Sequence, residues 1–108
     1  MINEILKLAK QNPYGFTFNL KTKRFAKFGY SVAYKETQNC FGTEGLKKAL
    51  THALNHNQIL GGWFNTENNK YYFDSIRIFK DKNEALRFAK DNEQIAIFDL
   101  ANLLEIKV

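Results

Sequence analysis

The chain has 108 residues, of which 44% are hydrophobic and 15% aromatic, and it carries a formal net charge of +5. This composition excludes a disordered chain, and the length suits a single domain with its own core. The single cysteine, Cys40, excludes an internal disulfide bond and predicts a reducing, cytoplasmic location. No apolar run approaches the roughly 20 residues that cross a bilayer, so no membrane partner is expected.

The positive charge is concentrated in the first third of the sequence. Residues 1–36 contain seven Lys or Arg and two Glu, whereas residues 74–108 contain six basic and seven acidic residues. This asymmetry favours a polyanionic partner or an acidic protein surface. The alternative is an ordinary solvated surface, because a net charge of this size is common in soluble domains.

The first part of the chain predicts a helix followed by two strands. Apolar residues at three- and four-residue spacing indicate a short helix over 3–11, which Asn12-Pro13 ends. The alternation in YGFTFNL predicts a half-buried strand over 14–20, and GYSVAYK predicts a second over 29–35. We expect these two strands to pair as a hairpin across a basic connector, residues 21–27.

Two longer helices are predicted further along. ETQNCFG, residues 36–42, has no periodicity and predicts a loop. Thr43 is suited to cap the helix that follows, to about residue 55, because its hydroxyl can accept a free backbone N–H. The last helix is predicted to begin at Asp81, with Asp81 in the cap position and Glu84 three residues on.

Between these helices, residues 59–79 predict the central β-hairpin. The polar run NTENN separates two runs of aromatic and β-branched residues, which is typical of strands joined by a turn. A turn centred on Glu67-Asn68 pairs Trp63 with Tyr72. The same register pairs Phe64 with Tyr71, Gly62 with Phe73 and Gly61 with Asp74. Glycines opposite large side chains leave room for rings to lie over the backbone.

The end of the chain completes the predicted fold. QIAIFDL predicts a strand over 94–100 that is covered on both faces, and residues 103–108 predict a short final strand. Residues 29–99 then follow the order βαββαβ, which predicts an α+β domain with a ferredoxin-like split βαβ core and an antiparallel or mixed sheet. Right-handed crossovers place both helices on one face. Residues 1–28 extend this core by a helix and a strand, and residues 100–108 add the C-terminal strand.

The basic connector is the first candidate binding surface. Lys21, Lys23, Arg24 and Lys27 alternate with Phe25 and Phe28. Cations attract phosphates and rings can stack on bases, so this pattern is compatible with nucleic acid. The alternative is a solvated hairpin loop whose phenylalanines fold under the sheet.

Aromatic residues of the predicted sheet are the second candidate surface. Tyr30 and Tyr34 share a side of one strand, and Trp63 and Tyr72 face each other in the hairpin. RNA recognition motifs stack bases on the open face of such a sheet. However, NKYYFDSIRIF lacks the sequence signature of that motif, and packing of the two tyrosines in the core is the alternative.

No catalytic residue, metal site or cofactor is predicted. His52 and His56 lie four residues apart on a helix, but zinc needs three or four ligands, so surface histidines are expected. Asp74 lies in an aromatic strand, where it needs hydrogen bonds or a raised pKa, and both a structural and a functional role are open. Nothing in the spacing orients a base onto Ser75 or Cys40.

Three phrases carry a resemblance: GYSVAYKETQNCFG, GGWFNTENNKYYFDS and QIAIFDL. They resemble small proteins of bacterial phages, plasmids and conjugative elements, over most of residues 14–108. Such genes often encode inhibitors of host defence systems, including anti-CRISPR proteins. The resemblance therefore implies an inhibitor whose partner is a host protein or nucleoprotein, and it implies no functional residue.

We therefore expect a non-enzymatic binding protein that inhibits a host defence nucleoprotein by covering its surface. One alternative is a single-stranded nucleic-acid-binding module that uses a basic and aromatic face of the sheet. The other is a small-molecule enzyme. The sequence leaves the oligomeric state open.

Overall fold

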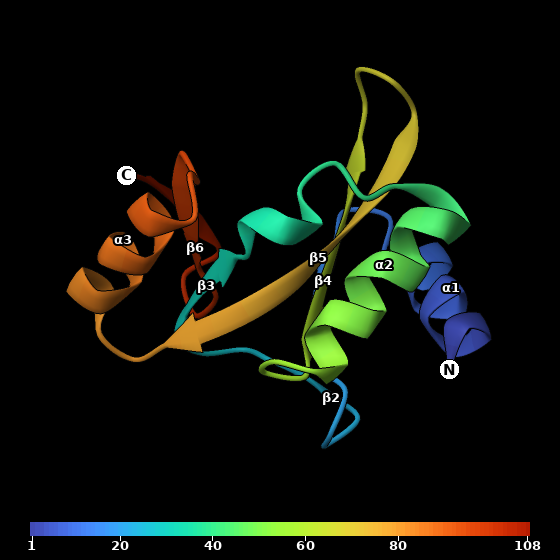
Figure 1. The fold of residues 1–108 in the computed structure, drawn as a ribbon, viewed down its shortest axis with the longest axis horizontal. Coiled ribbons are helices and arrows are strands. Elements are labelled where there is room, and N and C mark those ends of the chain that lie inside the picture. The colour runs from blue at the N-terminus through green and yellow to red at the C-terminus, as the bar shows by residue number, and fades with distance from the viewer.

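A seven-stranded antiparallel sheet runs through the molecule in the order β2-β1-β4-β5-β3-β6-β7 (Figure 1). The computed structural model describes residues 1–108. The strands are β1 (Phe16–Asn19), β2 (Arg24–Phe25), β3 (Tyr30–Ala33), β4 (Ile59–Asn65), β5 (Lys70–Phe79), β6 (Ala96–Asp99) and β7 (Leu104–Lys107). The helices are α1 (Ile2–Gln11), α2 (Gly42–Leu54) and α3 (Lys82–Asp91), with a 3₁₀ turn η1 (Lys35–Thr37). The predicted α+β class is confirmed.

The β4–β5 hairpin has the predicted register. Trp63 pairs with Tyr72, and Gly62 pairs with Phe73. Side chains in the turn hold the backbone, because the Asn65 and Asn68 side-chain oxygens accept bonds from the amides of Glu67 and Lys70. The end of this hairpin extends beyond the rest of the sheet (Figure 1).

All three α-helices lie on one face of the sheet. Alternate residues of a strand point to opposite faces. Phe73 packs in a cluster with α1 and α2, and Phe79 packs in a cluster with α3, so these two residues of β5 point towards the helices. Figure 1 shows α1 and α2 at one end of the sheet and α3 at the other. The opposite face, which we call the uncovered face because no helix lies on it, carries the other side chains of β5: Lys70, Tyr72, Asp74, Ile76 and Ile78, of which Ile76 is buried.

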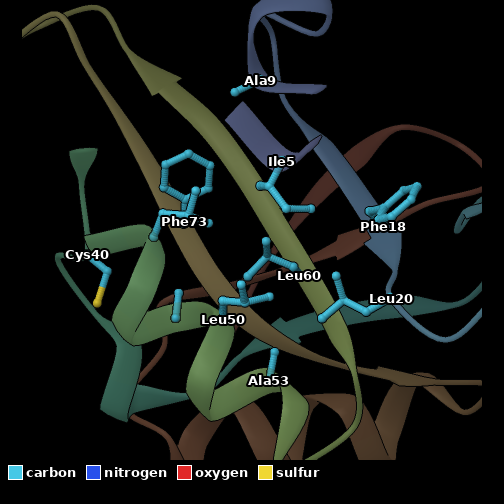
Figure 2. Packing of buried hydrophobic residues seen from close by; sticks show 11 residues of the cluster. Ile5, Ala9, Phe18, Leu20, Cys40, Leu50, Ala53, Leu60 and Phe73 are labelled. Carbon is cyan, nitrogen blue, oxygen red and sulfur yellow. The ribbon is translucent and has the colours of Figure 1, made fainter. Parts of the chain in front are cut away.

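The core is divided into two hydrophobic clusters. The larger cluster joins α1 and α2 to β1, β4 and β5, and Figure 2 shows Ile5 from α1 beside Leu60. The smaller cluster joins Val32, Phe79 and Ile97 to Ala85 and Ala89 of α3. Both clusters lie on the helical side, so burial of apolar surface holds the helices there and leaves the uncovered face without a helix.

The predicted hairpin between residues 14–20 and 29–35 is wrong. β1 pairs with β2 and β4, whereas β3 pairs with β5 and β6. Phe16 lies opposite Gly62, where a β-carbon would be only 2.5 Å from the Phe16 ring. The missing side chain of this distant glycine therefore makes room for the Phe16 ring and permits the pairing of β1 with β4.

Three smaller expectations can also be judged. α2 begins at Gly42 without a side-chain cap, so the predicted cap at Thr43 is wrong. The cap at Asp81 is confirmed, since its carboxylate accepts a bond from the amide of Asn83. β6 is buried more fully on the helical side: Ile97 is buried and packs towards α3, whereas Phe98, on the uncovered face opposite the buried Ser31, is half-buried.

Candidate functional site: the uncovered face of the sheet

Three aromatic rings form a row across the end of the uncovered face. Tyr72 stands at its centre, because it pairs with Trp63 on one side and forms an isolated bridge with Phe41 on the other. The Trp63 and Tyr72 rings are stacked, with centroids 4.8 Å apart and planes 17° apart. The Phe41 ring lies 5.5 Å from the Tyr72 ring. We call these three residues the aromatic row.

Polar groups flank the aromatic row. The ammonium of Lys70 lies 4.0 Å from the centre of the Phe41 ring, a cation–π contact. The side chain of Asn68 donates a hydrogen bond of 2.8 Å to the hydroxyl of Tyr72. Trp63 and Phe41 are 43% and 42% exposed, so their ring surfaces remain available to a ligand. A cation beside exposed rings suits a ligand that has both a flat ring and a negative charge.

Asp74 lies two residues further along β5 than Tyr72, on the same face and opposite Gly61. Burial raises the pKa of the Asp74 carboxyl to about 6, and a hydrogen bond with the Trp63 side chain partly opposes this shift. The sequence predicted either hydrogen bonds or a raised pKa for this carboxyl, and both are present. Chemically, the carboxyl can accept a hydrogen bond or change its charge near pH 6, directly beside the aromatic row.

The basic connector forms the β1–β2 end of the same sheet. Its turn is held by Asn19, whose side-chain oxygen accepts bonds from the amides of Lys21 and Thr22. Arg24 pairs with Asn19, which places it on the uncovered face. The basic connector contains four cations, and none of them takes part in an ion pair: Lys21, Lys23, Arg24 and Lys27. The basic connector, residues 21–27, is thus part of the β1–β2 hairpin, and from here on we call it the basic hairpin.

Phe25 belongs to the other side of this hairpin. Its ring packs edge-on against Phe18 at 5.4 Å and against Phe16 at 6.5 Å. This contact favours the interpretation in which the phenylalanine folds onto the sheet. Phe28, in contrast, is 79% exposed.

The basic hairpin and the aromatic row lie at opposite ends of the uncovered face. Ile59, the β4 residue nearest to Arg24, is four positions from Trp63, or about 13 Å along the strand. Between them lie the small residues Thr17 and Gly61. A ligand that reaches both ends must therefore be extended.

Tyr30 and Tyr34 lie on the helical side. Tyr30 packs against the smaller hydrophobic cluster. The Tyr34 ring contacts the rings of His52, His56 and Phe88 at 4.8, 5.1 and 5.2 Å. Tyr30 therefore packs against the core and Tyr34 packs among side chains of α2 and α3, so neither lies together with Trp63 and Tyr72.

A hydrogen-bonded chain that the sequence did not indicate joins α2 to β5. The Nδ1 atom of His52 lies 2.8 Å from Ser75 Oγ, and its Nε2 atom lies 3.3 Å from a carboxylate oxygen of Glu36. The expectation of a surface histidine is wrong for His52, although His56, stacked on it at 3.7 Å, is exposed. Ser75 has 0% exposure, so its hydroxyl cannot meet a substrate. These groups hold the helix on the sheet.

Two of the three residues of the aromatic row, and Asp74 beside it, were identified from the sequence. Trp63, Tyr72 and Asp74 were recognisable from strand alternation. Phe41 was missed because it lies in a stretch without periodicity. The Cys40 carbonyl accepts a bond of 2.8 Å from the amide of Phe73, which places the next residue beside Tyr72. Lys70 could have been found from the predicted register, since it is two residues from Tyr72.

Comparison of the chain with protein-family models, curated protein sequences and solved structures found no match. The structure contains no group of three or more His, Cys, Asp or Glu side chains arranged to hold a metal ion. None of its helices has the length and apolar character needed to span a membrane.

Proposed function

We propose that the protein acts by binding, and that its target is single-stranded nucleic acid exposed on a host nucleoprotein complex. The observation that carries this proposal is the aromatic row, whose exposed rings share one sheet face with unpaired cations. By occupying the strand, the protein would block the complex, as in the inhibitors of defence systems that the sequence resembles.

The residues of the uncovered face supply complementary interactions. Stacking on aromatic rings suits any base, because every base has a flat face. Lys70 and the basic hairpin would attract phosphates, and the extended spacing between them fits a strand laid across the sheet. Asp74 could accept a hydrogen bond from the edge of a base held against Trp63.

We also infer that residues 29–99 form a ferredoxin-like split βαβ core. What supports this is the order β4-β5-β3-β6 within the sheet, with β3 next to both β5 and β6 and with α2 and α3 on one face. The site nevertheless differs from that of an RNA recognition motif. On the uncovered face, β3 presents the small residues Ser31 and Ala33, so the rings come from the β4–β5 hairpin instead.

Two neighbouring substitutions test the proposal. Trp63 and Phe64 are adjacent in β4 and similarly exposed, at 43% and 38%, but they point to opposite faces. Trp63→Ala should weaken binding of a fluorescein-labelled single-stranded oligothymidine by roughly ten- to a hundredfold, because one stacked base is lost. Phe64→Ala should change it by less than about threefold. Fluorescence anisotropy at low salt measures both, and equal losses in the two variants would contradict the proposal.

A second candidate is occlusion of a protein surface without nucleic acid. Exposed Trp and Tyr side chains favour it, because these residues dominate the energy of many protein interfaces. Capture of the partner from host lysate, with and without nuclease treatment, separates the two. Capture that needs Trp63 and is lost after nuclease treatment supports nucleic-acid recognition, whereas capture that needs Trp63 and survives the treatment supports the second candidate.

A further inference from the structure

The two edges of the sheet differ in how well they are protected. β2, at one edge, has only two residues and is surrounded by the cations of the basic hairpin, which discourages pairing with another strand. β7, at the other edge, alternates apolar and charged residues in the sequence LEIK. Leu104 and Ile106 point to the helical side, and Glu105 and Lys107 point to the uncovered face. The β7 edge is therefore longer than the β2 edge and carries charges of both signs, so a strand with complementary charges can pair with it.

Free hydrogen-bonding groups of β7 can be identified from its pairing with β6. The amide of Val108 donates to the carbonyl of Ile95 at 2.9 Å, so these two residues form a hydrogen-bonded pair. Such pairs alternate along an antiparallel ladder, which makes Ile97–Ile106 the next one. The amides and carbonyls of Glu105 and Lys107 therefore point away from β6, where no further strand is present.

We infer that β7 pairs with β7 of a second copy of this chain, antiparallel and with the two-fold axis at Ile106. In this register Glu105 of each copy lies opposite Lys107 of the other. Both residues have outward-pointing backbone groups, so the two copies exchange four backbone hydrogen bonds. Ile106 of one chain lies opposite Ile106 of the second copy, between these two hydrogen-bonded pairs.

Charge selects this register over its neighbours. An axis at Glu105 would place two glutamates opposite each other, and an axis at Lys107 would place two lysines opposite each other. Like charges directly across a sheet are destabilising, whereas opposite charges are favourable. Only the axis at Ile106 makes both pairs of side chains complementary.

The apolar side of β7 is also consistent with a partner. Leu104 and Val108 are 58% and 48% exposed, and in the inferred register each lies opposite the other in the second copy. An open groove between β7 and α3, lined partly by Leu86 and Val108, leaves space beside them. A short strand pair buries less than the roughly 1,200–2,000 Å² of a standard interface, so the dimer should be weak and concentration-dependent.

This arrangement would extend the uncovered face. Residues directly opposite in an antiparallel pair point to the same side, so both uncovered faces would lie on one side of a continuous sheet. The inference does not depend on the proposed function, because β3 and β6 lie between β7 and the hairpin that carries Trp63.

A charge-swap series tests the register by sedimentation equilibrium. Wild type should show a mass that rises from one chain towards two between about 10 µM and 1 mM. Glu105→Lys or Lys107→Glu alone places like charges opposite each other in both pairs, and each should raise the dissociation constant at least about tenfold. An equimolar mixture of the two variants should dimerise again, because one chain then carries two lysines and the other two glutamates. The double swap, Glu105→Lys with Lys107→Glu, should also restore the dimer.

The same series controls for folding. Both side chains are exposed, and their contact within one chain, 2.9 Å, is a surface ion pair that contributes little stability. Thermal unfolding of the single variants should therefore match wild type. A wild-type mass of one chain throughout, single variants that dimerise like wild type, or a mixture that stays monomeric would each overturn the inference.

Discussion

Asp74 shows at the scale of one residue how the candidate site costs stability. Its pKa is raised from 3.8 to about 6 by burial in the folded protein. Between these values the folded protein holds a proton that the unfolded chain has lost, so stability falls as pH rises from about 4 to about 6 and stays lower above that. A difference of about two pKa units corresponds to about 3 kcal/mol. A residue retained at this cost beside exposed rings is consistent with a role in binding.

Replacing this carboxyl by an amide tests the cost. Asp74→Asn should be more stable than wild type by about 2 to 3 kcal/mol at pH 7.5, because the ionised group is no longer buried, and the difference should vanish near pH 4. Urea denaturation of both proteins across this pH range measures it.

Asp99 supplies the matched control. Hydrogen bonds from Asn102 and the amide of Ala101 hold the pKa of Asp99 below its ordinary value. Asp99→Asn should therefore lose stability at pH 7.5, the opposite sign. Parallel pH profiles for wild type and Asp74→Asn would show that Asp74 is not buried in ionised form.

At the scale of one element, Gly62 joins the β4–β5 hairpin to β1. A β-carbon there would lie 2.5 Å from the Phe16 ring and 2.8 Å from the Tyr71 ring. These rings stack at 6.3 Å and pack against the larger hydrophobic cluster. Gly62 thus allows two aromatic side chains to cover the backbone of β4.

Gly62→Ala should therefore destabilise the protein by about 1 to 3 kcal/mol, since both rings must move in a packed environment. The midpoint of urea denaturation, at constant slope, measures the change. Gly42→Ala is a useful comparison, because a β-carbon at Gly42 meets nothing within 4 Å and costs only the strain of its φ of +66°. A Gly62→Ala variant as stable as wild type would contradict the packing described for β1.

Elements with local signals could be predicted, whereas their long-range pairing could not. The β4–β5 register follows from a turn between adjacent strands, and the cap at Asp81 follows from residues within one helical turn. The partner of β1 depends on the Phe16 ring fitting over Gly62, which lies 46 positions away in the chain. Phe41 joined the site in the same way, through a backbone bond near Phe73 that no local pattern encodes.

At the scale of the whole molecule, three helices cover one face of the sheet and no helix covers the other, on which Ile76 and Ser31 are buried but Trp63 and Lys70 are exposed. The cations of the basic hairpin lie at one end of this face and the aromatic row lies at the other. Because neither end is locked into ion pairs, the face is suited to an extended anionic ligand that contacts both. We therefore propose that the helical side holds the fold together and that the uncovered face binds the ligand.

The salt dependence of binding to single-stranded oligothymidine is the most direct test of whether the uncovered face binds nucleic acid. If three to five of the cations contact phosphates, the logarithm of the binding constant should fall against the logarithm of salt concentration with a slope of roughly −2 to −3.5. Lys23→Glu with Arg24→Glu should reduce the magnitude of the slope by about 1.4, the value of two lost contacts. A slope near zero, or the same slope in the charge-reversed variant, would contradict binding of nucleic acid through this face.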